Sequence, residues 1–304
     1  MKFYILVFLI SFSSLSNAQM YNDTPFNAQV AHPKYGKEKG PKILIDAGHH
    51  NFIVEMDLIK PLISLMESDG YTTKIDSAIF TKDYLSKYKI LVIMPAMPFK
   101  FGSKGQVTDE VTFTPAELNA LHDWVADGGS LLMFGEHAPI DKSVTPLFNK
   151  FDIQVSIGIV SDSLNCDSTL KVSGYKTLIK YNETNGLLNQ SHPITLGANK
   201  MERIHNIVTY GGCGLTGAGY TNILQLAPSA IIKKYNGSSP SGTPNSQGLA
   251  GNVGKGKLVA LGDCNGFTAM YIPLKTGESY SAGMQVTNYD WKQFVLNTFH
   301  WLSK

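Results

Sequence analysis

Residues 42–48 read KILIDAG, and this stretch decides the fold. A short apolar run that ends in glycine is typical of a strand buried on both faces of a parallel sheet. Similar apolar runs predict further strands at Lys89–Met97, Ser130–Gly135 and Gly256–Gly262, and we also expect a strand at Tyr71–Ser77. The recurrence predicts that these strands together form the core of one sheet.

Helical segments separate the predicted strands. In Glu55–Asp69 the apolar residues fall three and four positions apart, which makes one helical face, and Lys82–Lys87 predicts a short helix. Thr114 and Glu117 have the spacing of a capping box at a helix start, and Asp290–Leu302 predicts a terminal helix. Strands that alternate with helices imply right-handed crossovers, so we expect an α/β fold with a doubly wound parallel sheet.

Composition divides the chain into an arm and one domain. Residues 19–40 are polar and interrupted by proline and glycine, which predicts an N-terminal arm. Residues 41–304 are expected to form a single α/β domain with a β-rich insertion at about 153–250, where a polar loop covers 237–247. Strand-like segments of the insertion are Ile153–Val160, Leu170–Lys180, Ile204–Tyr210 and Asn222–Lys234.

The first residues predict export. Residues 1–18 combine one lysine, an apolar run too short to span a bilayer and a small-x-small end at Ser16-Asn17-Ala18, which is the pattern of a secretory signal peptide. We therefore expect a secreted or periplasmic protein that is not inserted in a membrane after cleavage. The net charge is +2 in 304 residues, which excludes a strong electrostatic footprint for nucleic acid.

The three cysteines leave two readings open. An oxidising compartment permits one disulfide, and Cys166–Cys213 is the pair that the loop-like surroundings favour. The alternative is that Cys166, Cys213 and Cys264 are all unpaired, buried thiols.

Acidic and imidazole side chains follow three of the four strongest strands. In an open parallel sheet, ligands bind outside the carboxyl ends of the strands, and these ends meet at one edge. We therefore expect the groups to converge there, although the sequence separates them widely. They are Asp46, His49, His50 and Asn51 after the first strand, Glu136 and His137 after Ser130–Gly135, and Asp263, Cys264 and Asn265 after Gly256–Gly262.

Such a cluster supports three interpretations. His49, Glu136, His137 and Asp263 could bind a divalent metal such as zinc, although no spacing-defined metal motif occurs. The same four residues could act as catalytic acids and bases, with Cys264 as a weaker candidate nucleophile. A third reading is ligand binding without chemistry, through Asp46, His50, Asn51, Asn265 and Arg203.

Two functions from different classes follow. One is a hydrolase that acts on a carbohydrate or another small polar substrate, with residues 98–113 as a cover over the cleft. The other is a non-catalytic module that binds a carbohydrate or a protein on the same fold. Each polar residue taken alone also has a structural reading as a turn former or a partner for backbone groups.

A series of short motifs resembles a known family. The motifs begin with Ile45-Asp46-x-x-His49-x-Asn51-Phe52 and continue through Phe113-Thr114-x-x-Glu117, His137-Ala138-Pro139, His192-Pro193-Ile194 and His300-Trp301-Leu302. Together they are similar to an exported bacterial family, the domain of unknown function 4350, in the class I glutamine-amidotransferase-like superfamily. The resemblance implies a flavodoxin-like sheet and implies no particular reaction.

The superfamily comparison also argues against one reaction. Glutamine amidotransferases carry a nucleophilic cysteine in a Gly-x-Cys-x-Gly elbow after a strand. The corresponding stretch here is Phe134–Pro139, in which Glu136 stands at about the position of the thiol. The resemblance therefore implies that the chain is not a cysteine-dependent glutamine amidotransferase.

Overall fold

The fold is known from a computed structural model, which describes residues 20–23, 25–100, 111–138, 140–169, 175–234, 244–273 and 279–304. The predicted signal peptide lies outside the described residues. So do residues 101–110 of the predicted cover, 170–174 of a predicted strand and 237–243 of the polar loop. Within the described part, no helix is long and apolar enough to cross a bilayer.

Nine strands of the described chain form the main sheet. Five are parallel and lie in the order β3 (Thr72–Asp76), β2 (Lys42–Asp46), β4 (Ile90–Ile93), β5 (Ser130–Phe134) and β14 (Gly256–Leu261). The sheet continues through antiparallel strands, which are β13 (Ser246–Val253), β10 (Leu215–Thr216), β6 (Gln154–Val155) and β11 (Thr221–Gln225). Four of the five parallel strands coincide with apolar runs of the sequence, and the fifth, β3, lies within the predicted strand Tyr71–Ser77 although it is mostly polar. This agreement confirms a mixed α/β fold with a largely parallel sheet.

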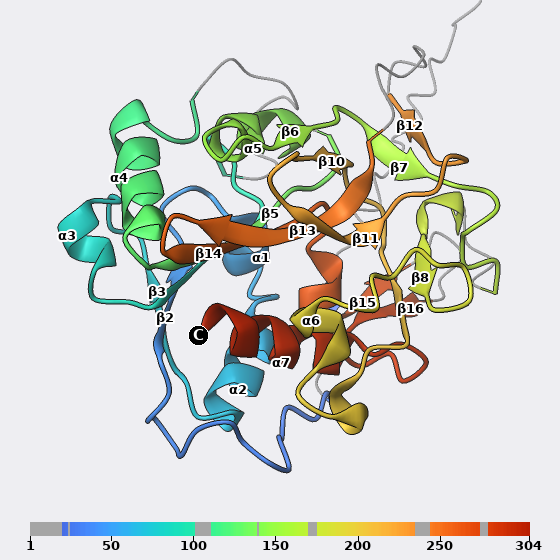
Figure 1. The fold of residues 1–304 in the computed structure, drawn as a ribbon, viewed down its shortest axis with the longest axis horizontal. Coiled ribbons are helices and arrows are strands. Elements are labelled where there is room, and N and C mark those ends of the chain that lie inside the picture. Colours follow the sequence, from blue (N-terminus) through green and yellow to red (C-terminus); the bar gives the residue numbers. More distant parts are fainter. Residues whose placement is uncertain are drawn as a thin grey trace, which may run out of the picture.

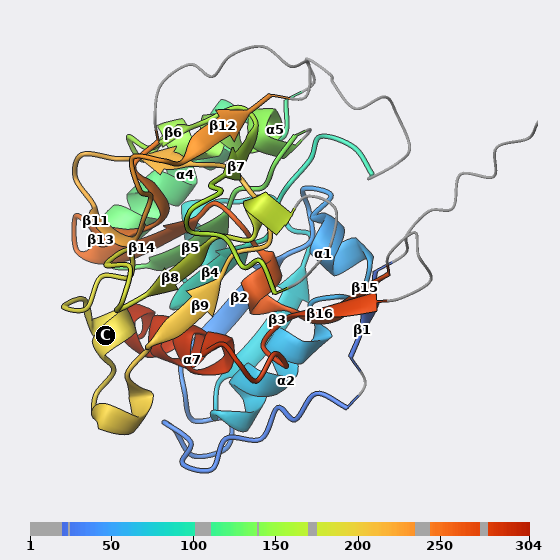
Figure 2. The same ribbon diagram turned by 90° about the vertical axis from the view of Figure 1, so that its right-hand side faces the viewer.

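Helices cover both faces of this sheet (Figures 1 and 2). α2 (Lys60–Ser68) and α7 (Trp291–Leu302) lie on one face, and α4 (Pro115–Ala126) and α5 (Ile140–Asn149) lie on the other. The shorter helices are α1 (Phe52–Glu55), α3 (Lys82–Leu85) and α6 (Pro193–Leu196). The layers leave the carboxyl ends of the parallel strands at one edge.

Two helices differ from expectation. The predicted helix Glu55–Asp69 is helical only over α2, from Lys60 to Ser68, and its first residue, Glu55, is the last of α1. The two helices cannot be continuous because Asp57 has a φ of 62°, which no α-helix accommodates. The helix α5 was not predicted. It contains Pro146, a residue that disfavours helix interiors and that obscured the apolar periodicity of this segment.

The second half of the chain adds small sheets. β7 (Ile159–Ser161) pairs with β12 (Ile231–Lys233), and β8 (Lys180–Asn182) pairs with β9 (Asn206–Val208). A three-stranded sheet joins the arm to the C-terminal part through β1 (Tyr21–Asn22), β15 (Ala269–Pro273) and β16 (Ser279–Gly283). The strands β7, β8, β9 and β12 each overlap a predicted segment and are shorter than it, whereas β1, β15 and β16 were not predicted.

The core lies between the parallel strands and the helices. The central residues of β2, β4, β5 and β14 are buried, and Trp291 and Phe294 of α7 pack edge-on against Phe267.

The three cysteines are buried and unpaired. The expected Cys166–Cys213 disulfide is therefore wrong, and the alternative of three free thiols is confirmed.

The start of α4 provides a direct test of the local sequence signal. The Thr114 hydroxyl accepts the Glu117 N–H at 3.2 Å, and the Glu117 carboxylate accepts the Thr114 N–H at 3.1 Å. Because Thr114→Ala removes the acceptor, we expect a loss of about 1 kcal/mol in the free energy of unfolding, measured in urea. Thr114→Ser keeps the hydroxyl and should lose little. Equal urea midpoints for Thr114→Ala and Thr114→Ser would show that the cap contributes nothing to the stability of the chain.

Candidate functional site

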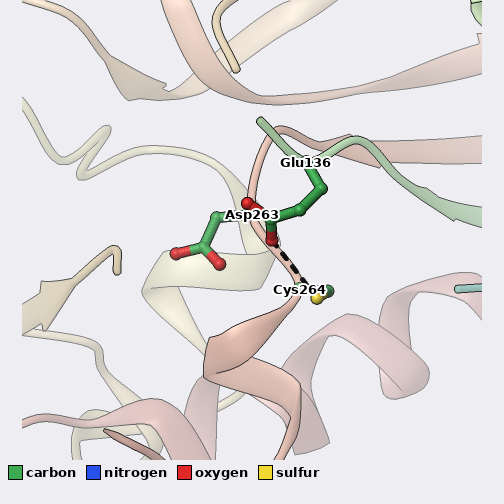
Figure 3. A group of neighbouring side chains, drawn as sticks. All are labelled: Glu136, Asp263 and Cys264. Carbon is green, nitrogen blue, oxygen red and sulfur yellow. Dashed lines mark hydrogen bonds between the residues drawn. The ribbon is translucent and has the colours of Figure 1, made fainter. Parts of the chain in front are cut away.

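Two carboxyl groups meet at the ends of neighbouring strands. Phe134 of β5 pairs in parallel with Leu261 of β14, and Glu136 and Asp263 each follow two residues later. Cys264 comes next in the chain. One ligand atom from each of Glu136, Asp263 and Cys264 lies within 4.8 Å of the other two. Figure 3 shows the two carboxyl groups side by side, with the Cys264 sulfur beside Glu136.

Burial dominates the electrostatics of this group. Glu136 is 3% exposed and Asp263 is 2% exposed. Burial raises the pKa of Glu136 to about 7; the nearby His137 opposes this shift and the Asp263 carboxyl adds to it. Burial also raises the pKa of Asp263, and it holds the pKa of the Cys264 thiol well above its usual range. The Cys264 S–H therefore donates to Glu136 Oε2, at 3.4 Å.

Neighbouring groups fix both carboxyls. Asp263 accepts the Tyr210 N–H, the Asn265 N–H at 2.8 Å and the Asn265 side-chain amide at 2.7 Å. The same amide lies 3.5 Å from Glu136 Oε2, and the His137 N–H donates to Glu136 Oε1 at 2.9 Å. Asn265, predicted to bind a ligand, thus touches both acidic side chains.

His137 forms the solvent side of the cluster. Its side chain is 40% exposed, and its Nε2 lies 3.7 Å from Glu136 Oε1. Its Nδ1 lies 2.9 Å from the Ala138 carbonyl oxygen, an acceptor that favours a proton on Nδ1. The structure thus brings together three of the four predicted catalytic residues, Glu136, His137 and Asp263.

A glycine-rich loop covers the strand ends. A Cβ at Gly212 would lie 2.1 Å from the Gly262 carbonyl oxygen, and one at Gly135 would lie 2.5 Å from the Cys213 sulfur. Gln247 of β13 donates to the Gly211 carbonyl at 2.8 Å and holds the loop from the other side. The glycines therefore serve close backbone approach, and the loop packs directly against the strand end at Gly262 and Asp263.

His49 belongs to a second cluster, at the end of β2. Its Nδ1 lies 2.9 Å from Asp46, and its Nε2 lies 3.3 Å from Glu117. Burial lowers the pKa of His49, but the hydrogen bonds and charges of Asp46 and Glu117 outweigh burial and raise it. The Asn51 amide also donates to Asp46, at 3.1 Å. The arrangement is that of an imidazolium held between two carboxylates.

This second cluster corrects the expected metal site. Only β4 lies between β2 and β5 in the sheet order, so the ends of β2 and β5 are two strand spacings apart, about 10 Å of backbone at about 4.8 Å per strand. His49 contacts Asp46 and Glu117, and the donor atoms that lie within 4.8 Å of one another are those of Glu136, Asp263 and Cys264. The expected set of His49, Glu136, His137 and Asp263 is therefore not assembled among the described residues. Sequence reasoning treated Glu117 as a helix cap and missed that its carboxylate also faces His49.

Two other predicted binding residues lie at the surface. His50 is paired with Glu55 at 2.9 Å, with 45% of its side chain exposed. Arg203 is paired with Glu183 at 3.0 Å and donates to Gln190 at 2.9 Å. The structure gives both residues surface partners and places neither among the contacts of the two clusters.

No protein-family model and no curated protein matches the chain. Its structure is similar to the N-terminal domain of mmIFT52, with a TM-score of 0.58 and 16% identity over 86% of this chain and 97% of that domain. It is also similar to ThuA-like proteins from Bacteroides uniformis and from Parabacteroides merdae. The first has a TM-score of 0.43 and 14% identity, over 92% of this chain and 95% of that one. The second has a TM-score of 0.46 and 12% identity, over 88% of this chain and 91% of that one. At such identity the likeness to the mmIFT52 domain shows a shared fold alone.

Proposed function

We propose that the chain is an exported hydrolase of the glutamine-amidotransferase-like superfamily, acting on a carbohydrate or another small polar substrate. The order β3-β2-β4-β5-β14 supports the flavodoxin-like arrangement of that superfamily, because it places the first parallel strand of the chain between the second and the third. The segment 153–250 then represents an insertion before the last parallel strand. Export rests on the pattern of residues 1–18.

One observation carries the hydrolase proposal. Glu136 and Asp263 occupy equivalent positions beyond two adjacent parallel strands, at the edge where α/β enzymes bind substrates. Carboxyl groups serve hydrolysis by moving protons at the reacting bond or by holding a metal ion that lowers the pKa of bound water. His137 connects the buried pair to solvent.

The same cluster argues against cysteine-dependent chemistry. The nucleophile of a thiol enzyme is the thiolate, whereas burial and the Glu136 and Asp263 carboxyls raise the pKa of the Cys264 thiol. Glutamine hydrolysis through Cys264 is therefore not part of the proposal.

A second function has a specific observation in its favour. The loop at 211–214 packs against the strand end that carries Asp263, and both carboxyls already accept hydrogen bonds from protein groups. These contacts suit a non-catalytic binding module, in which the cluster braces loops that hold a carbohydrate or a protein.

An activity screen separates the two functions. The full chain is assayed against panels of glycosides and esters beside Glu136→Gln, with the exposed Glu183→Gln as the matched control. The proposal expects hydrolysis that falls at least about 100-fold in Glu136→Gln and is unchanged in Glu183→Gln. Hydrolysis that survives in Glu136→Gln contradicts it. Glycan binding without turnover of any substrate supports the binding module.

A further inference from the structure

The cluster at the ends of β5 and β14 contains the donor types that zinc prefers. Cys264 supplies sulfur, Glu136 and Asp263 supply oxygen, and His137 supplies an imidazole nitrogen. Zinc is bound in proteins by these donors, most often four in a tetrahedron. Neither the sulfur nor the role of Cys264 as a partner of Glu136 was part of the metal set that the sequence predicted.

The observed separations fit a common ion. Donors about 2.0–2.3 Å from a tetrahedral zinc lie about 3.3–3.8 Å from one another. The Cys264 sulfur is 3.4 Å from Glu136 Oε2, and His137 Nε2 is 3.7 Å from Glu136 Oε1. The Asp263 carboxyl lies within 4.8 Å of both other acidic groups. The group whose donor atoms all lie within 4.8 Å of one another is Glu136, Asp263 and Cys264, and His137 contacts it through Glu136. A rotation of the His137 side chain is therefore needed to bring the fourth donor to the same cation.

Burial makes a cation favourable at this position. Glu136, Asp263 and Cys264 are each at least 97% buried, and buried charges are costly unless they are paired or coordinate a metal. A divalent ion would neutralise two of these groups where water is excluded.

Hydrogen bonds to other protein groups orient two of the four donor side chains, His137 and Asp263. His137 is held through Nδ1 by the Ala138 carbonyl, which leaves Nε2 on the side of Glu136. The Asn265 side chain and the Tyr210 N–H hold the Asp263 carboxyl. Metal-binding histidines and carboxylates typically have such outer partners, which fix the tautomer and the orientation.

We propose that Glu136, Asp263, Cys264 and His137 form a binding site for a divalent zinc-class ion. The inference deepens the proposed function, because such an ion would supply the activated water of a hydrolase. It depends on that function only for the catalytic role of the ion, since the binding itself is measurable without any substrate.

Zinc binding is tested on the full chain after treatment with a chelator. Zinc chloride is titrated, with stoichiometry measured by native mass spectrometry and stability by thermal unfolding. We expect one zinc per chain, a higher Tm and binding at least about 10-fold weaker in Cys264→Ser than in the native chain. Cys166→Ser, which changes a buried thiol outside the cluster, is the control and should bind normally.

Cobalt substitution makes the result independent of folding defects. Cobalt(II) bound by Cys264 should show a thiolate charge-transfer band that is absent in Cys264→Ser and present in Asp263→Asn at reduced affinity. No zinc binding by the native chain, or equal binding by Cys264→Ser, overturns the inference. Zinc binding without hydrolysis sustains the inference and contradicts the hydrolase. Hydrolysis by the zinc-free chain supports the hydrolase and overturns the catalytic role of the ion.

Discussion

Replacing His49 by alanine should destabilise the chain by about 3–5 kcal/mol, measured by urea unfolding at about pH 6. The imidazole lies between Asp46 and Glu117, and all three side chains are buried. Without the imidazolium, two carboxylates face a cavity with no positive charge between them. The change also removes the ring that packs between Phe80 and Phe113, with centroids 4.9 and 4.3 Å away.

The pH dependence of this effect has a defined sign. The folded state raises the pKa of His49 above 6.5, so the charged imidazole contributes its full stability below about pH 6.5. That contribution is lost as the pH rises through the folded-state pKa. The difference between the native chain and His49→Ala should therefore shrink as the pH rises above about 6.5.

The neighbouring histidine provides the control. His50 forms a half-exposed pair with Glu55, so His50→Ala should change the free energy of unfolding by about 0–1 kcal/mol. Equal effects of His49→Ala and His50→Ala would show that the buried ion triad is not formed.

Gly212→Ala is the second substitution with a large expected effect. Gly212 has a φ of 85°, and an added Cβ would lie 2.1 Å from the Gly262 carbonyl oxygen, which belongs to the backbone and cannot rotate away. The strain of a left-handed backbone conformation and the overpacking together predict that the free energy of unfolding falls by about 2–5 kcal/mol, measured by thermal or urea unfolding.

Gly186→Ala separates strain from crowding. Gly186 has a similar φ of 69°, but nothing lies within 4 Å of an added Cβ. We expect Gly186→Ala to lower the free energy of unfolding by about 1–2 kcal/mol, because it adds backbone strain and no crowding. If Gly212→Ala were no more damaging than Gly186→Ala, the loop would not be pressed against the strand ends as the structure has it.

The sequence predicted the parallel half of the sheet well for a physical reason. Strands buried on both faces need continuous apolar residues, so segments such as 42–48 and 256–262 stand out from their surroundings. The capping box at Thr114 was equally clear, because two residues three positions apart specify it. The strands after residue 150 carry weaker patterns, since most of them are short and pair in small sheets.

The candidate site could be predicted only in part. That Glu136 and Asp263 lie together follows from topology, because each ends a strand of the same parallel sheet. Which strand ends are adjacent depends on the strand order in the sheet, and the apolar pattern of each single segment does not reveal that order. His49 was therefore grouped with Glu136, although β4 lies between β2 and β5, and its partner Glu117 is distant in the sequence and faces it only through tertiary packing.

The convergence of Glu136 and Asp263 is tested most directly by a double-mutant cycle. The free energy of unfolding is measured with a chelator present for the native chain, Glu136→Gln, Asp263→Asn and the double variant. The structure predicts a coupling of at least about 0.5 kcal/mol, because the two carboxyls share one buried space. Effects that add to within about 0.3 kcal/mol would contradict the shared site.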